Sequence, residues 1–319
     1  MKAVLYWLAA LLMWVLVVFI IWLGVSNRGL QWVYQLSTPY LPAELHIGQV
    51  DGRIVGPIVL TGVHYQASDG NRFNSEQLTL DWNPWSLLEG RVDIQSILIN
   101  TLLIEKSDTA VVEATAASAE IITLPDINLP LPLRLQKLQV QNINLTQGAR
   151  TLHFTQLELS GSTLFNQVTI NQLMLKGESF EITTSGEIRL AGKYRHDLKL
   201  NWRHQLSEHR GLHGQGRLTG NLLSTKLNHT IDGLVRMDLQ AELSNVLDNL
   251  EWQSSLDVKQ FDSRDFDFVE ALSGMPSLSG QLKLSSSGNL QKQQLNGQFS
   301  GKNSDLGPFK SSFDINRSS

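Results

Sequence analysis

The middle of the chain repeats one short pattern, and this repeat limits the fold more than any other feature. Three runs have the form Φ-x-Φ-x-Gly, in which Φ is Leu or Ile, and their glycines Gly161, Gly177 and Gly192 lie about 15 or 16 residues apart. Apolar residues two positions apart share one face of a strand. We therefore expect the chain to grow by adding similar strands, about two short strands per repeat. The apolar positions of the three repeats are Leu157, Leu159, Leu173, Leu175, Ile188 and Leu190.

The same alternation extends over residues 43–319 and predicts a mostly β fold. Its runs are about five or six residues long and end at polar turns, which is typical of all-β chains. Gly216–Gly220 and Gly280–Leu284 are looser copies of the repeat. One face of the predicted sheet is rich in Leu, Ile and Val, and the other in Thr, Ser, Gln and Asn. Only Asn83–Gly90 and Asp262–Gly274 have helical patterns within this region.

The N-terminus predicts a membrane anchor over residues 1–26. Ala3–Val25 carries no charged residue and as a helix would span roughly 35 Å, enough to cross a bilayer core. Trp7 and Trp22 lie near its ends, where indole rings favour the membrane interface. A cleaved signal peptide is the alternative, although its apolar region is usually only about 7–15 residues. Lys2 lies before the span, which places the N-terminus in the cytoplasm by the positive-inside rule.

Two further segments divide the chain. Residues 27–42 space their apolar side chains as a short amphipathic helix that would leave the membrane along its surface. Residues 107–132 combine small residues with three prolines, the composition of a mobile or extended crossing. This crossing is either a loop inside one β assembly or a domain boundary. We therefore expect an anchor, a juxtamembrane helix and a repetitive β region with a break at 107–132.

Composition and motifs favour a non-enzymatic protein. The net charge of −4 and pI near 6.1 provide no basic footprint for nucleic acid, and there is no cysteine. Gly211–Gly220 lacks the Gly-Lys-Ser/Thr ending of a phosphate loop, so strand-end glycines are expected there. His204, His209 and His213 match no standard zinc spacing, and Asp262, Asp265, Asp267 and Glu270 lack the rhythm of a calcium loop. We expect no catalytic residue, no metal site and no cofactor.

The predicted apolar face has two interpretations. It is either the buried core of a closed sandwich or solenoid, or the lining of an open, curved sheet that holds a greasy ligand. Large exposed apolar surfaces normally bind a partner or ligand. A membrane anchor at one end makes lipid the candidate, and the six repeat positions would then contact it.

Four ordered motifs near the N-terminus resemble the start of the TamB family, the inner-membrane subunits of the translocation and assembly module, which is itself similar to the AsmA-like proteins. The clear likeness covers roughly residues 1–105, beyond which the repetitive β character agrees. The motifs are Ile47–Gly52 (IGQVDG), Leu60–Tyr65 (LTGVHY), Leu80–Pro84 (LDWNP) and Leu87–Ile94 (LLEGRVDI).

The resemblance implies a single-pass protein of the bacterial inner membrane, with a periplasmic, taco-like β groove whose inner face is hydrophobic. Family members are associated with phospholipid movement between the inner and outer membranes and with assembly of outer-membrane proteins and autotransporters, alongside the barrel protein TamA. The family has no catalytic residues to carry over. Because family members are much longer, we expect a fragment that does not reach TamA. The alternative is a chaperone-like β module with a closed core that binds client strands by β-addition.

Overall fold

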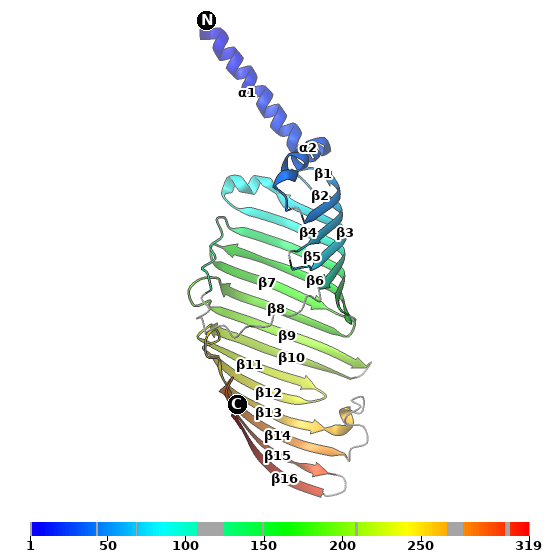
Figure 1. Ribbon diagram of the computed structural model, residues 1–319, viewed down its shortest axis with the longest axis vertical. Coiled ribbons are helices and arrows are strands. Elements are labelled where there is room, and N and C mark those ends of the chain that lie inside the picture. The colour runs from blue at the N-terminus through cyan, green and yellow to red at the C-terminus, as the bar shows by residue number, and fades with distance from the viewer. Residues whose placement is uncertain are drawn as a thin grey trace. The chain divides into compact units, whose positions relative to one another are not determined.

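The computed structural model consists of a helical N-terminus followed by β-strands that each pair with the next in the chain (Figure 1). It describes residues 2–42, 44–67, 69–106, 124–148, 150–207, 210–266, 277–303 and 307–318. Within these residues there is one open sheet of 16 strands in the order β1 to β16. The mostly β prediction is confirmed.

The helical elements are α1 (Lys2–Val25), α2 (Asn27–Ser37) and the 3₁₀ helices η1 (Thr38–Tyr40), η2 (Pro84–Glu89) and η3 (Ser263–Phe266). The first eight strands are β1 (Leu45–Gly52), β2 (Ile58–Gln66), β3 (Arg72–Asn83), β4 (Val92–Lys106), β5 (Leu133–Gln147), β6 (Arg150–Leu164), β7 (Gln167–Lys176) and β8 (Phe180–Arg189). The remaining strands are β9 (His196–Ser207), β10 (Arg210–Asn221), β11 (Ser224–Gly233), β12 (Arg236–Ser244), β13 (Glu251–Asp262), β14 (Leu278–Asn289), β15 (Lys292–Asn303) and β16 (Gly307–Ser318).

The strands are longer than the sequence predicts, and each repeat supplies one strand rather than two. β4, β5 and β6 each have 15 residues. The three repeats fall on the consecutive strands β6, β7 and β8. The expectation of five or six residues is wrong because polar residues and even glycines continue the strands: Gly161 lies inside β6, whereas Gly177 and Gly192 lie in turns.

β4 and β5 run parallel, whereas every other pair with a described register is antiparallel. Parallel neighbours require a connection that returns the chain to the starting end of the sheet. Residues 107–132 form this connection, so the proline-rich crossing of the sequence has a topological role. Residues 107–123 lie outside the described residues.

The chain divides into two compact units. The first unit comprises Met1–Val112 and Leu131–Ser162, and the second comprises Glu113–Pro130 and Thr163–Ser319. The second unit thus includes most of the β4–β5 connection. There Ile127 N–H donates to the Leu190 carbonyl (2.8 Å) and Leu129 N–H donates to the Phe165 carbonyl (3.0 Å). The Tyr194 hydroxyl also donates to the Pro125 carbonyl.

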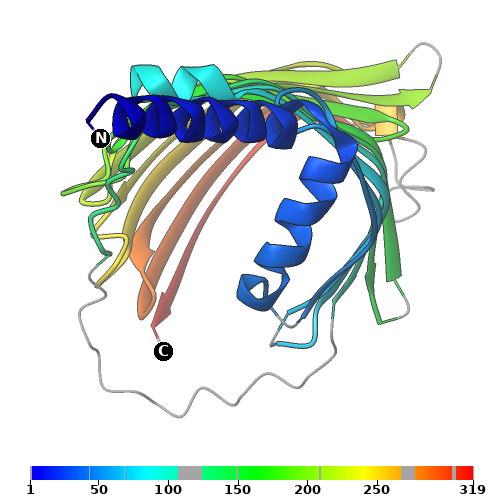
Figure 2. The ribbon, with the colours of Figure 1, turned by 90° about the horizontal axis from the view of Figure 1, so that it is seen from above.

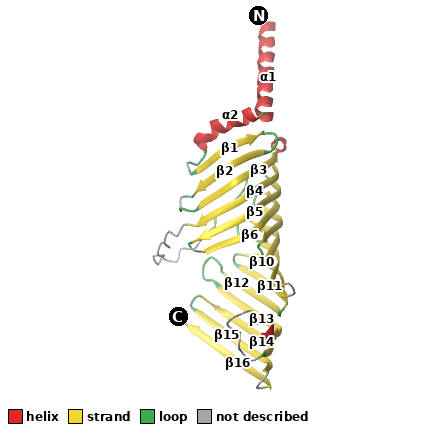
Figure 3. Ribbon diagram, turned by 90° about the vertical axis from the view of Figure 1, so that its right-hand side faces the viewer, coloured by secondary structure: helices red, strands yellow, loops and turns green. Residues whose placement is uncertain are grey.

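In the first unit, α2 lies along β1 at an angle to α1 (Figure 3). The corner between the helices is fixed by Ser26, whose side chain accepts a hydrogen bond from Gly29 N–H (2.9 Å) as an N-cap. Asn27 joins this corner to the first hairpin, because its side-chain amide oxygen accepts a hydrogen bond from Gly52 N–H (3.2 Å). The residues predicted as one amphipathic helix, 27–42, contain α2 and η1.

No single helix of the described chain has the length and apolarity that a membrane span requires. One pair of helical segments reaches both only when taken together: Leu11–Val25 and Asn27–Tyr40, which meet at 90°. The transmembrane anchor at 1–26 therefore stays a prediction. The second predicted helix, Asp262–Gly274, is described only as the short η3, since residues 267–276 lie outside the described residues.

Candidate functional site

Cross-strand register gathers the apolar residues of the second unit on one face of its sheet. Residues directly opposite each other in paired strands project from the same face, as do residues two positions along a strand. One row across β8–β16 consists of Thr184, Leu200, Gly216, His229, Leu239, Leu256, Leu284, Gly297 and Phe313. The next row consists of Ile182, Trp202, Gly214, Ile231, Met237, Val258, Leu282, Phe299 and Ser311. We call this surface the apolar face of the second unit.

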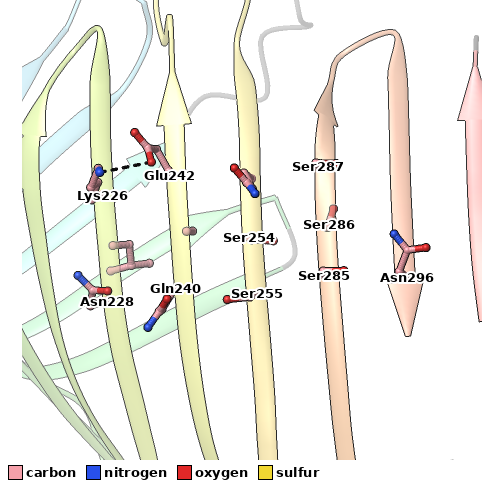
Figure 4. Close-up of a pocket in the computed structure, with 13 residues that line it drawn as sticks. Lys226, Asn228, Gln240, Glu242, Ser254, Ser255, Ser285, Ser286, Ser287 and Asn296 are labelled. Atoms are coloured by element: carbon pink, nitrogen blue, oxygen red, sulfur yellow. Dashed lines mark ion pairs between the residues drawn. The ribbon is translucent and has the colours of Figure 1, made fainter. Parts of the chain in front are cut away.

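The opposite face of the same strands is polar. A depression of about 410 Å³ lies on it between β11 and β15, lined mainly by serine hydroxyls and by Asn and Gln amides (Figure 4). Lys226 pairs with Glu242 at its rim (3.5 Å). Elsewhere Arg217 hydrogen-bonds Asp197 and holds the pKa of that carboxyl below its usual value. These neutral and paired groups form a solvated surface.

The apolar face of the second unit is only half-buried. Among the described residues, just six apolar side chains are buried, and two of them belong to the second unit. A sheet packed against a second layer would bury most of one face. Instead, in the part of the second unit that the structure describes, each strand contacts chiefly its neighbours in the sheet. The buried six are Leu30, Val50, Val140, Ile143, Val235 and Val258.

A Trp–His pair lies over two glycines on this face. Trp202 Nε1–H on β9 donates to His229 Nε2 on β11 (2.9 Å), and the rings are stacked with centroids 6.1 Å apart. The rings bridge β10 because Gly214 and Gly216 have no side chain; a Cβ at Gly214 would lie 2.4 Å from Trp202 Nε1. Burial lowers the pKa of His229. The pair therefore places a neutral imidazole in an otherwise apolar surface.

The first unit has an apolar face of the same kind. A row across β1–β5 runs from Val50 to Val140, and both of these end residues are buried. A second row contains Tyr65 and Phe73, whose ring centroids lie 5.9 Å apart. The members of the first row are Val50, Leu60, Leu78, Ile99 and Val140, and those of the second are Leu45, Tyr65, Phe73, Ile104 and Leu145.

The six repeat positions lie in both units. Leu173, Leu175 and Ile188 share the apolar face of the second unit, because a bulge in β7 between Ile170 and Leu173 restores the alternation. Leu190 follows β8, and its N–H donates to the Asn166 carbonyl (2.7 Å). The remaining two, Leu157 and Leu159, lie on one face of β6 in the first unit. All six side chains are half-buried.

The motifs considered for other chemistry are dispersed. Gly211–Gly220 lies within β10: Gly211 and Gly220 are next to the two ends of the strand, as expected, whereas Gly214 and Gly216 lie in its interior. On β10 the residue opposite His204 is Leu212, which directly precedes His213. Because consecutive residues of a strand project from opposite faces, His204 and His213 lie on opposite faces of the sheet. His209, Asp267 and Glu270 lie outside the described residues. Within the described chain, no group of three His, Cys, Asp or Glu side chains could hold a metal ion.

The comparison with known families agrees with this architecture. Residues 16–120 and 105–317 match the family described as "TamB, N-terminal domain". The chain belongs to the TamB family. The match extends well past residue 105, so the repetitive β region also belongs to the TamB N-terminal portion. No curated protein and no solved structure matches this TamB chain.

Sequence reasoning missed the Trp202–His229 pair of this TamB chain. The two residues are 27 positions apart and meet across β10. A signal was present in the sequence, since Gly214 and Gly216 alternate with polar residues and thus leave one face of a strand without side chains. Such a gap in an otherwise apolar row indicates that a large ring from a neighbouring strand fills it.

Proposed function

We propose that this chain is an inner-membrane-anchored, non-catalytic segment whose apolar sheet face carries phospholipid acyl chains through the periplasm, between the inner and outer membranes. The half-buried apolar face, over which the described residues place no second layer, supports this proposal above all. Each acyl methylene transferred from water to an apolar surface gains about 0.8 kcal/mol. A row of Leu, Ile and Phe side chains across many strands suits a long, flexible hydrocarbon better than a compact polar substrate.

The N-terminal helix supports membrane anchoring. Every large apolar side chain from Leu11 to Trp22 is 42–68% exposed, and Trp7 is 78% exposed. Such a helix needs an apolar surrounding. Family membership favours the same location, with the strands in the periplasm and with a connected role in the assembly of outer-membrane proteins and autotransporters.

The second candidate is a chaperone-like module that binds client strands. Among the described residues β1 and β16 are the outermost strands of the sheet, and a client strand would pair with an edge such as that of β16 by β-addition. Phe313 and Ile315 on this strand are 41% and 54% exposed. A client strand would pair with the backbone of β16, whereas lipid would contact side chains along the whole apolar face, so substitutions at Leu256 and Leu284 on β13 and β14 separate the two functions.

Bound phospholipid in the purified full chain tests the proposal. The double substitution Leu256→Asp and Leu284→Asp adds two charges to the apolar face. Ser255→Asp and Ser285→Asp add the same two charges to the polar face one residue away on the same strands. We expect the leucine variant to lose phospholipid, measured by mass spectrometry of extracted lipid, and the serine variant to retain it. Equal lipid content in the two folded variants would contradict the proposal.

A further inference from the structure

The 3₁₀ helix η2 carries a small cluster of exposed apolar side chains. Trp85 is 62% exposed, Leu87 44% and Leu88 83%. In a 3₁₀ helix the residues i and i+3 lie one above the other, so Trp85 and Leu88 project from the same side. These three residues, which we call the η2 cluster, are too few for a stable protein interface, which needs about 800 Å² from each partner.

The η2 cluster is held rigidly on the first unit. The Asn83 side chain caps η2 by accepting from Trp85 N–H (3.1 Å). Ser86 is completely buried; its hydroxyl donates to the Asn83 carbonyl (2.6 Å) and accepts from Asp93 N–H (3.1 Å). Gly90 closes the turn in the left-handed conformation, with φ of 70°. Exposed apolar side chains on so well-fixed a turn require an external partner.

The end of α1 and the start of η2 are joined through two consecutive residues of the β1–β2 turn. Val55 N–H donates to the Gly24 carbonyl at the end of α1 (2.9 Å). The carbonyl of the preceding residue, Ile54, accepts from Trp82 Nε1–H (3.0 Å), and Trp82 directly precedes the cap of η2. Figure 1 shows η2 at the same end of the first unit as the corner between the helices, and Figure 2 shows that end from above.

We propose that the η2 cluster inserts into the interface of the same bilayer that holds α1, as a second membrane contact of the first unit. The proposal rests on the membrane anchoring of α1 given above. A Trp with neighbouring Leu side chains is the composition of interfacial anchors. The ion pair Arg91–Glu89 (2.7 Å) lies at the cluster's edge, where charged groups would meet lipid headgroups. Two contacts would fix the orientation of the sheet against the membrane, which a single helix cannot do.

Lipid-attached quenchers test this proposal directly. Because the chain has no cysteine, single-cysteine variants of the full chain can be labelled with an environment-sensitive fluorophore without further changes. The test site is Leu88→Cys, and the matched control is Leu290→Cys, a leucine 70% exposed in the β14–β15 turn. Val18→Cys reports on α1 itself. All three are reconstituted in phosphatidylglycerol–phosphatidylethanolamine nanodiscs that contain nitroxide-labelled lipid.

We expect a loss of emission for Leu88→Cys and Val18→Cys, and none for Leu290→Cys. Quenching of Val18→Cys without quenching of Leu88→Cys would overturn the second contact while leaving the anchor intact. Quenching of Leu88→Cys alone would refute the anchor, and with it the proposal that η2 and α1 share one bilayer. If neither Leu88→Cys nor Val18→Cys is quenched, both the η2 contact and the α1 anchor are overturned. Equal quenching of Leu88→Cys and Leu290→Cys would also overturn the η2 contact, because it would show that proximity to lipid is not specific to η2.

Discussion

Gly214→Ala tests whether the Trp202–His229 pair organises the apolar face of the second unit. The added Cβ would lie 2.4 Å from Trp202 Nε1 and 2.7 Å from His229 Nε2. Ordinary van der Waals contacts begin at 3.4 Å, so the indole must move by about 1 Å, the difference between 3.4 Å and the 2.4 Å at Trp202 Nε1. This movement breaks the 2.9 Å hydrogen bond from Trp202 to His229.

The expected cost combines three effects. Overpacking costs about 1–3 kcal/mol and loss of the hydrogen bond about 0.5–1.5 kcal/mol. Alanine offsets about 0.4–1 kcal/mol by restricting the unfolded chain. The net loss of about 0.5–4 kcal/mol corresponds to a fall in Tm of about 1–16 °C for a unit of this size.

Thermal unfolding of the full chain in detergent, followed by circular dichroism, measures this shift. Gln215→Ala is the matched control on the same strand, because its exposed side chain faces the other side, and we expect a change within about 0.5 kcal/mol. In a Trp202→Ala background Gly214→Ala should cost clearly less, since the indole and its hydrogen bond are absent and the close contact that remains is with His229 Nε2. An unchanged Tm for Gly214→Ala alone, or an equal loss in both backgrounds, would refute the reasoning.

Three further predictions concern His229, Ser86 and Ile143. Because burial lowers the pKa of His229, the unfolded chain binds a proton at this residue more readily than the folded chain, and stability should fall as pH drops below about 6.5. Thermal melts at pH 7.5 and 5.5 should show a smaller fall for His229→Gln than for the wild type. Identical pH profiles for the two proteins would contradict this prediction. Ser86→Ala should cost about 1–3 kcal/mol in thermal melts by leaving the Asp93 N–H unpaired, while wild-type stability would show that the turn needs no such bond. Ile143→Ala, in a buried position, should lower the free energy of unfolding by about 2–5 kcal/mol, and Leu239→Ala on the half-buried face should lower it by clearly less. Equal losses of this free energy in denaturant unfolding would indicate a closed core.

The sequence predicts the local parts of this fold well. Period-two alternation at Leu173 and Leu175 identifies a strand and its apolar face, because side-chain direction depends only on the local backbone. Asn83 and Gly90 likewise predict the short helical turn that η2 forms. Strand length is less predictable, because an antiparallel ladder tolerates glycine and polar residues such as Gly161 wherever neighbouring strands supply the pairing.

The non-local parts could not be predicted. The parallel pairing of β4 with β5 depends on a connection whose composition only suggests a crossing. The Trp202–His229 contact depends on the register of three strands. For the candidate site, the face of Leu173, Leu175 and Ile188 was predictable, whereas the absence of a second layer over the described part of that face required the structure.

Site-specific photocrosslinking in native membranes tests the central claim most directly, with the probe placed in turn at Leu173, Met174 and Leu175. Leu173 and Leu175 lie on the apolar face, whereas Met174, an equally half-buried apolar residue between them, pairs with Thr183 on the polar face. The account predicts phospholipid adducts at both leucines and none at Met174. Crosslinks from the leucines only to this same chain, or lipid adducts at all three positions alike, would contradict it.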